Sequence, residues 1–208
     1  MILRTESVWY RLMEWMMRLA YLNFLWFIFT LLGGIVFGWV PATLAVNKSL
    51  RKFMIENESI SIFPYFWNVY RKQFIRSQIV NVLFIALGLL LFIDMKFFMS
   101  GNHALFILGK MVTIQLVIGY FVLFIYFFTI YAHQEMRFIE KVKNSILYGI
   151  VHPIKSLLML INSSLLIMLF LFFPQLFIFF GVSSLAYFNI LCSQKVLYKK
   201  NNSISHSS

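Results

Sequence analysis

The residues that could perform acid–base or metal chemistry are few and scattered in this chain of 208 residues. The four histidines are His103, His133, His152 and His206. None stands in an H-x-x-x-H or H-E-x-x-H spacing, which would place two metal ligands on one helical face. The single cysteine, Cys192, excludes an intrachain disulfide and a cysteine-based metal cluster. We therefore expect no metal ion and no cofactor.

Motifs for covalent or phosphoryl chemistry are also missing from the sequence. Ser163 has no G-x-S-x-G context, and the chain carries no P-loop and no G-x-G-x-x-G fingerprint. Asp94 is the one carboxylate beside an apolar run, and its neighbour Lys96 suggests a surface ion pair. Because positioned acid, base and metal groups are missing, we predict that the protein is not an enzyme.

The composition points to a membrane protein. Hydrophobic residues make up 61% of the chain and charged residues only 12%, about half the charged fraction of a soluble domain. Such a chain cannot cover a globular surface with polar groups. The predicted fold class is all-α: a polytopic helical membrane protein with about five transmembrane helices and interfacial amphipathic helices.

Charge-free runs mark the expected spans, because ionisable side chains in the bilayer core are costly. The run 156–194 is nearly twice as long as one crossing needs, and Pro174 near its middle predicts a helical hairpin. The predicted spans are about 19–40, 77–98, 109–131, 156–173 and 175–194. They form a single membrane domain, followed by a tail at about 199–208 that we expect to be disordered.

The basic residues predict the topology. Eighteen Lys and Arg against seven Asp and Glu give a net charge of +11. Thirteen of the eighteen fall in 41–78, 132–155 and the C-terminal tail, which places these segments in the cytoplasm and the N-terminus outside. This distribution favours anionic lipid over nucleic acid as the reason for the charge, and we expect no nucleic-acid partner. A re-entrant first segment that bends at Gly33 and Gly34 is the alternative to a full first crossing.

Amphipathic segments flank the spans. One at the N-terminus leads into the first span, and two more, at 42–55 and 62–76, place an apolar or aromatic stripe opposite a basic one. The residues that we expect to contact lipid or a partner in these two are Lys48, Arg51, Lys52, Phe63, Phe66, Trp67, Tyr70, Arg71, Lys72, Phe74 and Arg76. The helices either anchor the protein at the interface or dock a partner protein.

Neutral polar residues and glycines remain inside the spans. Side chains such as Asn81 and Gln115 are expected to bond to neighbouring helices or to their own backbone. The alternative is a small polar pathway built on 162–164, which reads Asn-Ser-Ser. Gly34 and Gly38 form a G-x-x-x-G spacing that predicts close helix packing, although two glycines four apart also occur by chance.

The sequence resembles a known family over three stretches. These are 18–26, the exit from the first span at 34–43 and the aromatic–basic segment 63–77. They are similar to the YesL-like family, catalogued as a domain of unknown function, number 624. The resemblance implies a multi-pass protein of the bacterial plasma membrane, in a family whose genes tend to lie beside carbohydrate ABC importers.

The resemblance leads to one main hypothesis. We expect a non-enzymatic accessory subunit or regulator of a carbohydrate ABC importer, with the lipid bilayer and the permease or ATPase subunits as partners. The chain lacks the E-A-A-x-x-x-G motif through which permeases of such importers contact their ATPase. The alternative is an independent small-solute transporter or channel, which would need a polar cavity among Asn81, Gln115 and 162–164.

Overall fold

The computed structural model describes residues 2–56, 61–101, 103–133 and 138–205, and these form helices and no strand. The elements are α1 (Ile2–Leu32), α2 (Trp39–Arg51), the π-helix η1 (Lys52–Glu56), α3 (Ile62–Met99), α4 (Ala104–His133), α5 (Phe138–Val151), α6 (Pro153–Phe172) and α7 (Pro174–Ser205). The predicted all-α fold class is confirmed.

Five helical stretches are long and apolar enough to cross a membrane. They are Trp9–Leu32, Ile62–Met99, Ala104–Tyr131, Pro153–Phe172 and Pro174–Ser193. Large apolar side chains lie exposed along them, for example Leu90 and Phe92 on α3 and Leu105 on α4. Such surfaces suit lipid rather than water, so these helices fit a lipid bilayer.

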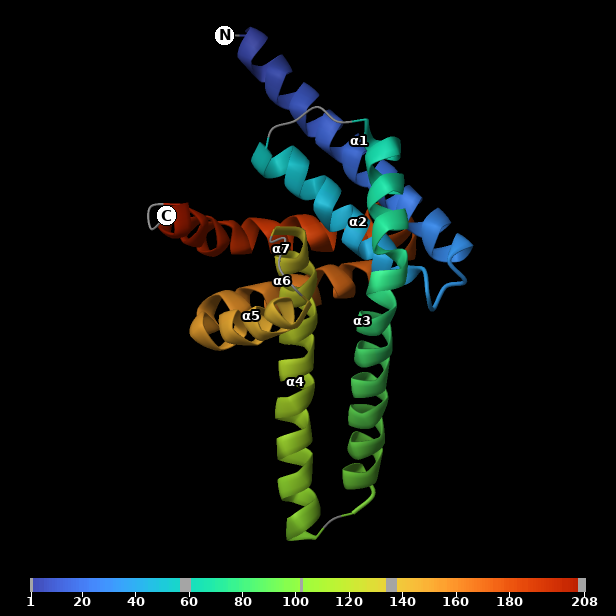
Figure 1. The fold of residues 1–208 in the computed structure, drawn as a ribbon, viewed down its shortest axis with the longest axis vertical. Helices are drawn as coiled ribbons and strands as arrows, with labels where there is room; N and C mark the ends of the chain where they lie inside the picture. The colour runs from blue at the N-terminus through green and yellow to red at the C-terminus, as the bar shows by residue number, and fades with distance from the viewer. Residues whose placement is uncertain (1, 57–60, 102, 134–137, 206–208) are drawn as a thin grey trace.

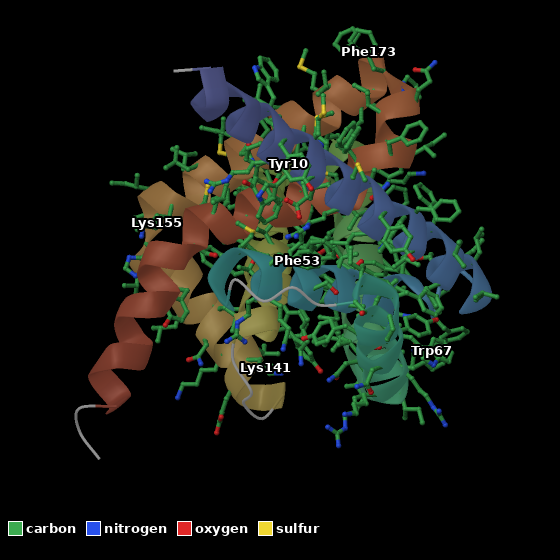
Figure 2. All side chains as sticks on the ribbon, turned by 90° about the horizontal axis from the view of Figure 1, so that it is seen from above. Tyr10, Phe53, Trp67, Lys141, Lys155 and Phe173 are labelled. Carbon is green, nitrogen blue, oxygen red and sulfur yellow. The ribbon has the colours of Figure 1, made fainter. Side chains whose placement is uncertain are left out.

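The long helices point in two directions. α3 and α4 form an antiparallel hairpin along the long axis of the molecule, and its far half extends beyond the other helices (Figure 1). α6 and α7 run across this hairpin, and the view from above shows them from the side (Figure 2). The five apolar stretches agree in number with the predicted spans, and the two helix pairs differ in direction.

The first predicted span, 19–40, is not one helix. α1 includes the N-terminal amphipathic segment, ends at Leu32 and is followed by a turn over 33–38. Gly34 has a φ of 75° and Ile35 a φ of 59°, the left-handed conformation that stops a helix. The chain therefore bends where the re-entrant alternative expects it, and Trp39 and Val40 belong to α2.

α2 is an internal helix and not the interfacial helix that we expected for 42–55. It packs against α1, α3, α4 and α7. Its buried residues are Val40, Pro41, Ala42, Leu44, Ala45, Val46, Asn47, Ser49 and Leu50. The helix carries no charge before Lys48, so its first two and a half turns can be enclosed on every side without burying an ion.

α3 includes two elements that the sequence predicts as separate helices. The expected interfacial helix 62–76 and the expected span 77–98 form one helix of 38 residues, about 57 Å long. Pro64 lies in the first turn, where a proline leaves no helical hydrogen bond unmade. The segment 62–76 therefore prolongs the apolar part of α3 in its own direction and does not lie flat beside it.

Two further elements differ from the expectations. The segment 138–151, for which we predict no helix between the spans 109–131 and 156–173, forms α5. α7 continues to Ser205, whereas we expected disorder from about 199; residues 206–208 lie outside the described part of the chain. The break between α6 and α7 falls at Phe173 and Pro174, where the hairpin was expected.

Side chains of α3 donate hydrogen bonds to backbone carbonyls at the end of α1 and in the turn that follows it. Three α3 side chains donate: Tyr70 to the Phe29 carbonyl at 2.9 Å, Gln78 to the Phe37 carbonyl at 3.1 Å and Asn81 to the Val36 carbonyl. Asn81 also accepts a hydrogen bond of 2.9 Å from the indole N–H of Trp39. Irregular backbone among apolar helices is stable only with such partners.

Asn23 makes a similar connection between α1 and α7. Its amide nitrogen donates to the carbonyls of Phe177 and Ile178 at 2.9 and 2.7 Å. Its amide oxygen accepts from the backbone N–H groups of Val182 and Ser183 at 2.9 and 3.3 Å. The Asn23 side chain thus forms hydrogen bonds with both carbonyls and N–H groups of the α7 backbone. The expectation that neutral polar residues bond between helices is confirmed for Asn23 and Asn81.

The glycine packing differs from the G-x-x-x-G expectation. A Cβ on Gly34 would meet nothing within 4 Å, because Gly34 lies in the open turn. A Cβ on Gly38 would lie 2.5 Å from the carbonyl oxygen of Thr30, and one on Gly33 would lie 2.4 Å from the Cα of Gly38. The close approach therefore joins the end of α1 to the start of α2, with Gly33 in the place expected for Gly34.

We predict that Gly38→Ala destabilises the protein by about 1–3 kcal/mol, since the new methyl group would collide with fixed backbone. Gly119→Ala on α4 is the matched control, because its Cβ would meet nothing within 4 Å. Thermal unfolding of the two purified variants measures the difference. Equal stability of both variants would disprove the close approach.

A second variant tests the hydrogen bonds of the turn. We expect Asn81→Leu to destabilise the protein by about 1–3 kcal/mol, because the Trp39 N–H and the Val36 carbonyl each lose their partner. Gln115→Leu makes the same chemical change at an exposed position of α4 and should leave the unfolding temperature nearly unchanged. An unchanged unfolding temperature for Asn81→Leu would contradict the role assigned to this amide.

Candidate functional site

A basic pocket lies between the last turns of α2 and the first half of α3. Its volume is about 540 Å³. The residues that line this basic pocket are Lys48, Tyr65, Asn68, Val69, Lys72, Gln73 and Arg76. Lys48 comes from α2 and the other six from α3, so the packing of these two helices creates the pocket.

The charged residues that line the basic pocket are all positive. Three of its lining residues, Lys48, Lys72 and Arg76, are cationic, and none of the described lining residues is acidic. Lys72 and Arg76 are exposed, whereas Lys48 is half-buried. Three like charges around one cavity repel one another and attract an anion.

Tyr131 ties the basic pocket to α4 and α5. Its hydroxyl donates a hydrogen bond to the side-chain oxygen of Gln73. The ammonium of Lys141 on α5 lies 3.4 Å from the centre of its ring, and that of Lys48 lies 5.9 Å from it. Cation–π attraction thus stabilises two positive charges that would otherwise repel each other. Lys141 is 7% exposed, which makes it part of the framework rather than the outer surface.

Other basic groups at this end of the molecule also lie over rings. The Lys52 ammonium lies 5.2 Å from the ring centre of Tyr65, a lining residue of the basic pocket. The Arg18 guanidinium lies 4.7 Å from the ring centre of Phe53 and pairs with Glu14. In the view from above, Figure 2 shows Phe53 near the centre, Lys141 and Trp67 lower in the view, and Phe173, at the α6–α7 link, at the opposite edge. The long stems of these side chains therefore fill space as well as carry charge.

The aromatic face expected for 62–76 divides into two parts. Phe66 and Tyr70 are buried, and Phe74 is partly buried against the same core. Phe63 and Trp67 remain 49% and 44% exposed. Together with the exposed Arg71 they follow one another at intervals of four residues, so they share one face of α3. We call Phe63, Trp67 and Arg71 the outer stripe.

Phe29 of α1 holds the outer stripe in place from behind. Its ring centre lies 6.3 Å from that of Phe63 and 5.4 Å from that of Trp67, while Phe29 itself is 4% exposed. Tyr70 packs on the same ring at 4.9 Å. The two exposed aromatic rings are therefore held by a buried neighbour and keep a defined orientation.

The structure brings together only some of the residues predicted as contacts. Lys48, Lys72 and Arg76 converge on the basic pocket. Arg51 and Lys52 are half-buried and belong to the last turn of α2 and to η1. The predicted contact residues do not include six residues of the site: Tyr65, Asn68, Val69, Gln73, Tyr131 and Lys141. The four on α3 share a helical face with Lys72 and Arg76, which periodicity could have shown, whereas Tyr131 and Lys141 come from α4 and α5 and have no such signal.

The residues proposed for a polar transport cavity do not gather. Asn81 bonds to the turn and to Trp39, and Gln115 is exposed on the far half of the α3–α4 hairpin. Asn162 and Ser163 lie on α6, each with a buried polar atom that has no hydrogen-bond partner. Within the described residues, no group of three or more His, Cys, Asp or Glu could hold a metal ion.

Comparison with known proteins identifies relatives without a known activity. Residues 19–95, from the middle of α1 to near the end of α3, match the model of a family described as "Protein of unknown function, DUF624". Three relatives come from Bacillus subtilis (strain 168): the uncharacterized proteins YesV, YteU and YesL. YesV is 30% identical over 81% of both chains. YteU is 31% identical over 90% of this chain and 82% of its own. YesL is 31% identical over 83% of this chain and 81% of its own. No solved structure matches the chain.

Proposed function

The chain belongs to the DUF624 family, and from this premise we propose that it is a non-enzymatic accessory subunit or regulator within a larger membrane assembly. The observation that carries the proposal is the outer stripe. The outer stripe places an exposed Trp and an exposed Arg on one rigid helical face. Trp and Arg are among the residue types that contribute most to protein–protein binding. A helix presenting such a face can dock into a groove of a partner.

The position of the outer stripe suits contact with another membrane protein. It belongs to the first half of α3, beyond the charge-free run that begins at Ser77. The apolar half of α3 can therefore remain in lipid while the outer stripe meets a partner outside the hydrocarbon. Since Phe29 holds its rings, docking would lose little side-chain entropy.

A carbohydrate ABC importer is the partner that the family resemblance favours, through its permease or its ATPase subunit. The chain carries no E-A-A-x-x-x-G motif, so it would not replace the permease but would bind beside it. A separate role as a small-solute transporter finds no support in the arrangement of Asn81, Gln115 and Ser163.

The proposed location is the bacterial plasma membrane, with the C-terminus and the outer stripe on the cytoplasmic side. Arg76 and Asp94 bound the apolar run of α3 and lie about 27 Å apart along the helix, close to the hydrocarbon thickness. The excess of basic residues in 41–78 and 132–155 supports an inward-facing basic end.

Cysteine labelling in intact cells tests this orientation. In a Cys192→Ser background, His103→Cys at the hairpin tip should react with a membrane-impermeant maleimide in intact cells. Arg71→Cys should react only after the cells are permeabilised. These two positions lie at opposite ends of the α3–α4 hairpin (Figure 1). The reverse pattern would invert the topology, and equal labelling of both sites would refute a crossing by α3.

Partner capture tests the docking proposal. The tagged protein, purified gently from its own host, should retain a carbohydrate-importer permease or ATPase, identified by mass spectrometry. Arg71→Glu should reduce that recovery at least tenfold, because it reverses a charge on the outer stripe without removing a buried group.

Arg11→Glu is the matched control, since it reverses an exposed charge on α1 beside two exposed aromatic residues, Trp9 and Tyr10. It should leave recovery of the importer subunit unchanged. Recovery of the protein alone, together with normal sugar uptake after deletion of the gene, would refute the accessory role. Equal loss with both variants would show that the outer stripe is not the docking face.

A further inference from the structure

We propose that the basic pocket is a binding site for a phosphate group, carried either by a lipid headgroup or by a small soluble molecule. The proposal goes beyond the accessory role and does not depend on it, because the basic pocket and the outer stripe share no residue.

The first argument is the charge of the lining. Lys48, Lys72 and Arg76 surround one cavity of about 540 Å³, and no described lining residue is acidic. Lys52 and Lys141 add positive charge nearby, over the rings of Tyr65 and Tyr131. Positive charges gathered around one cavity attract an anion into it.

The second argument is the kind of donor that the basic pocket offers. A guanidinium can hold two phosphate oxygens at once, and ammonium groups bind phosphate as point charges. Asn68 and Gln73 add amide groups, and Tyr65 adds a hydroxyl. The Gln73 oxygen already accepts the hydrogen bond from Tyr131, so its NH₂ group is the part of the amide that can serve an anion. The donors thus suit an oxyanion better than a cation or an apolar molecule.

The third argument is the depth of the basic pocket. Arg76 directly precedes Ser77, where the charge-free run of α3 begins, and Lys72 lies about one turn further out. Ile75 and Ile79, 82% and 66% exposed, lie on the same stretch of α3. The phosphate would therefore be held where the apolar part of the helix ends, at the level of lipid headgroups and within reach of soluble phosphate compounds.

The size of the basic pocket leaves both sources possible. Its volume lies within the range of small-molecule sites, about 300–1,000 Å³, so it exceeds what inorganic phosphate alone needs. The shared chemistry is the phosphate group, and the rest of the ligand has room beside Tyr65 and Val69.

The experiment measures binding to the purified full-length chain in uncharged detergent at constant ionic strength. One arm titrates radiolabelled inorganic phosphate by equilibrium dialysis. A second arm titrates short-chain phosphatidic acid and measures the bound lipid by native mass spectrometry. We expect saturable binding in at least one arm, with a stoichiometry of one per chain.

Charge-removing variants locate the site. Lys72→Gln combined with Arg76→Gln should weaken binding at least tenfold, and Lys48→Gln alone, from α2, should weaken it in the same direction. If the double variant fails to fold, the Lys48→Gln variant alone tests the site. The matched control is Lys96→Gln combined with Lys110→Gln, which removes two charges at the hairpin tip and should leave the affinity unchanged.

The outcomes separate the sources and can overturn the proposal. Binding of phosphate that competes with the lipid indicates a soluble ligand or a site open to both, and binding of the lipid alone indicates a headgroup site. No saturable binding in either arm would refute the proposal. Equal losses in the pocket and tip variants would refute it too, because they would show general charge attraction and no defined site.

Discussion

The requirement that backbone carbonyls find donors in an apolar environment shapes the centre of this protein. α1 stops at Leu32, and the carbonyls of Val36 and Phe37 in the following turn then need partners that the helix cannot supply. Because Gln78 and Asn81 provide them and Tyr70 donates to the Phe29 carbonyl at the end of α1, α3 must lie against the turn in one register. That register also places α3 beside α2, and the basic pocket forms between these two helices.

The helical class and the apolar stretches could be predicted from the sequence because they depend on composition and on runs without charge. The position of α2 could not, because an apolar stripe looks the same whether it faces lipid or other helices. Its charges lie from Lys48 onward, which leaves the first part free to be enclosed. The limits of α3 were missed for a related reason: Arg76 ends the apolar run, but a charge at the membrane surface does not end a helix.

The site could be predicted only in part. Lys72 and Arg76 share one helix and one face, so periodicity finds them together. Lys48 joins them only because α2 packs on α3, Tyr131 because α4 packs on both, and Lys141 because α5 packs on α4. The glycines show the same limit, since the spacing of Gly34 and Gly38 satisfies a motif, while Gly33 makes the close contact. A local pattern identifies which residue types are present, and tertiary packing decides which of them meet.

The length of α3 has a mechanical consequence. The helix is continuous from Ile62 to Met99, and Asn81, which fastens it to the turn and to Trp39, lies at its middle. At the far end Phe97 packs on Phe106 of α4, with ring centres 5.6 Å apart, so the hairpin tip follows the helix. α3 is thus a rod held at Tyr70, Gln78 and Asn81, and its far half carries the hairpin tip beyond the other helices (Figure 1). A continuous helix of this kind keeps the tip at a set distance from the basic pocket.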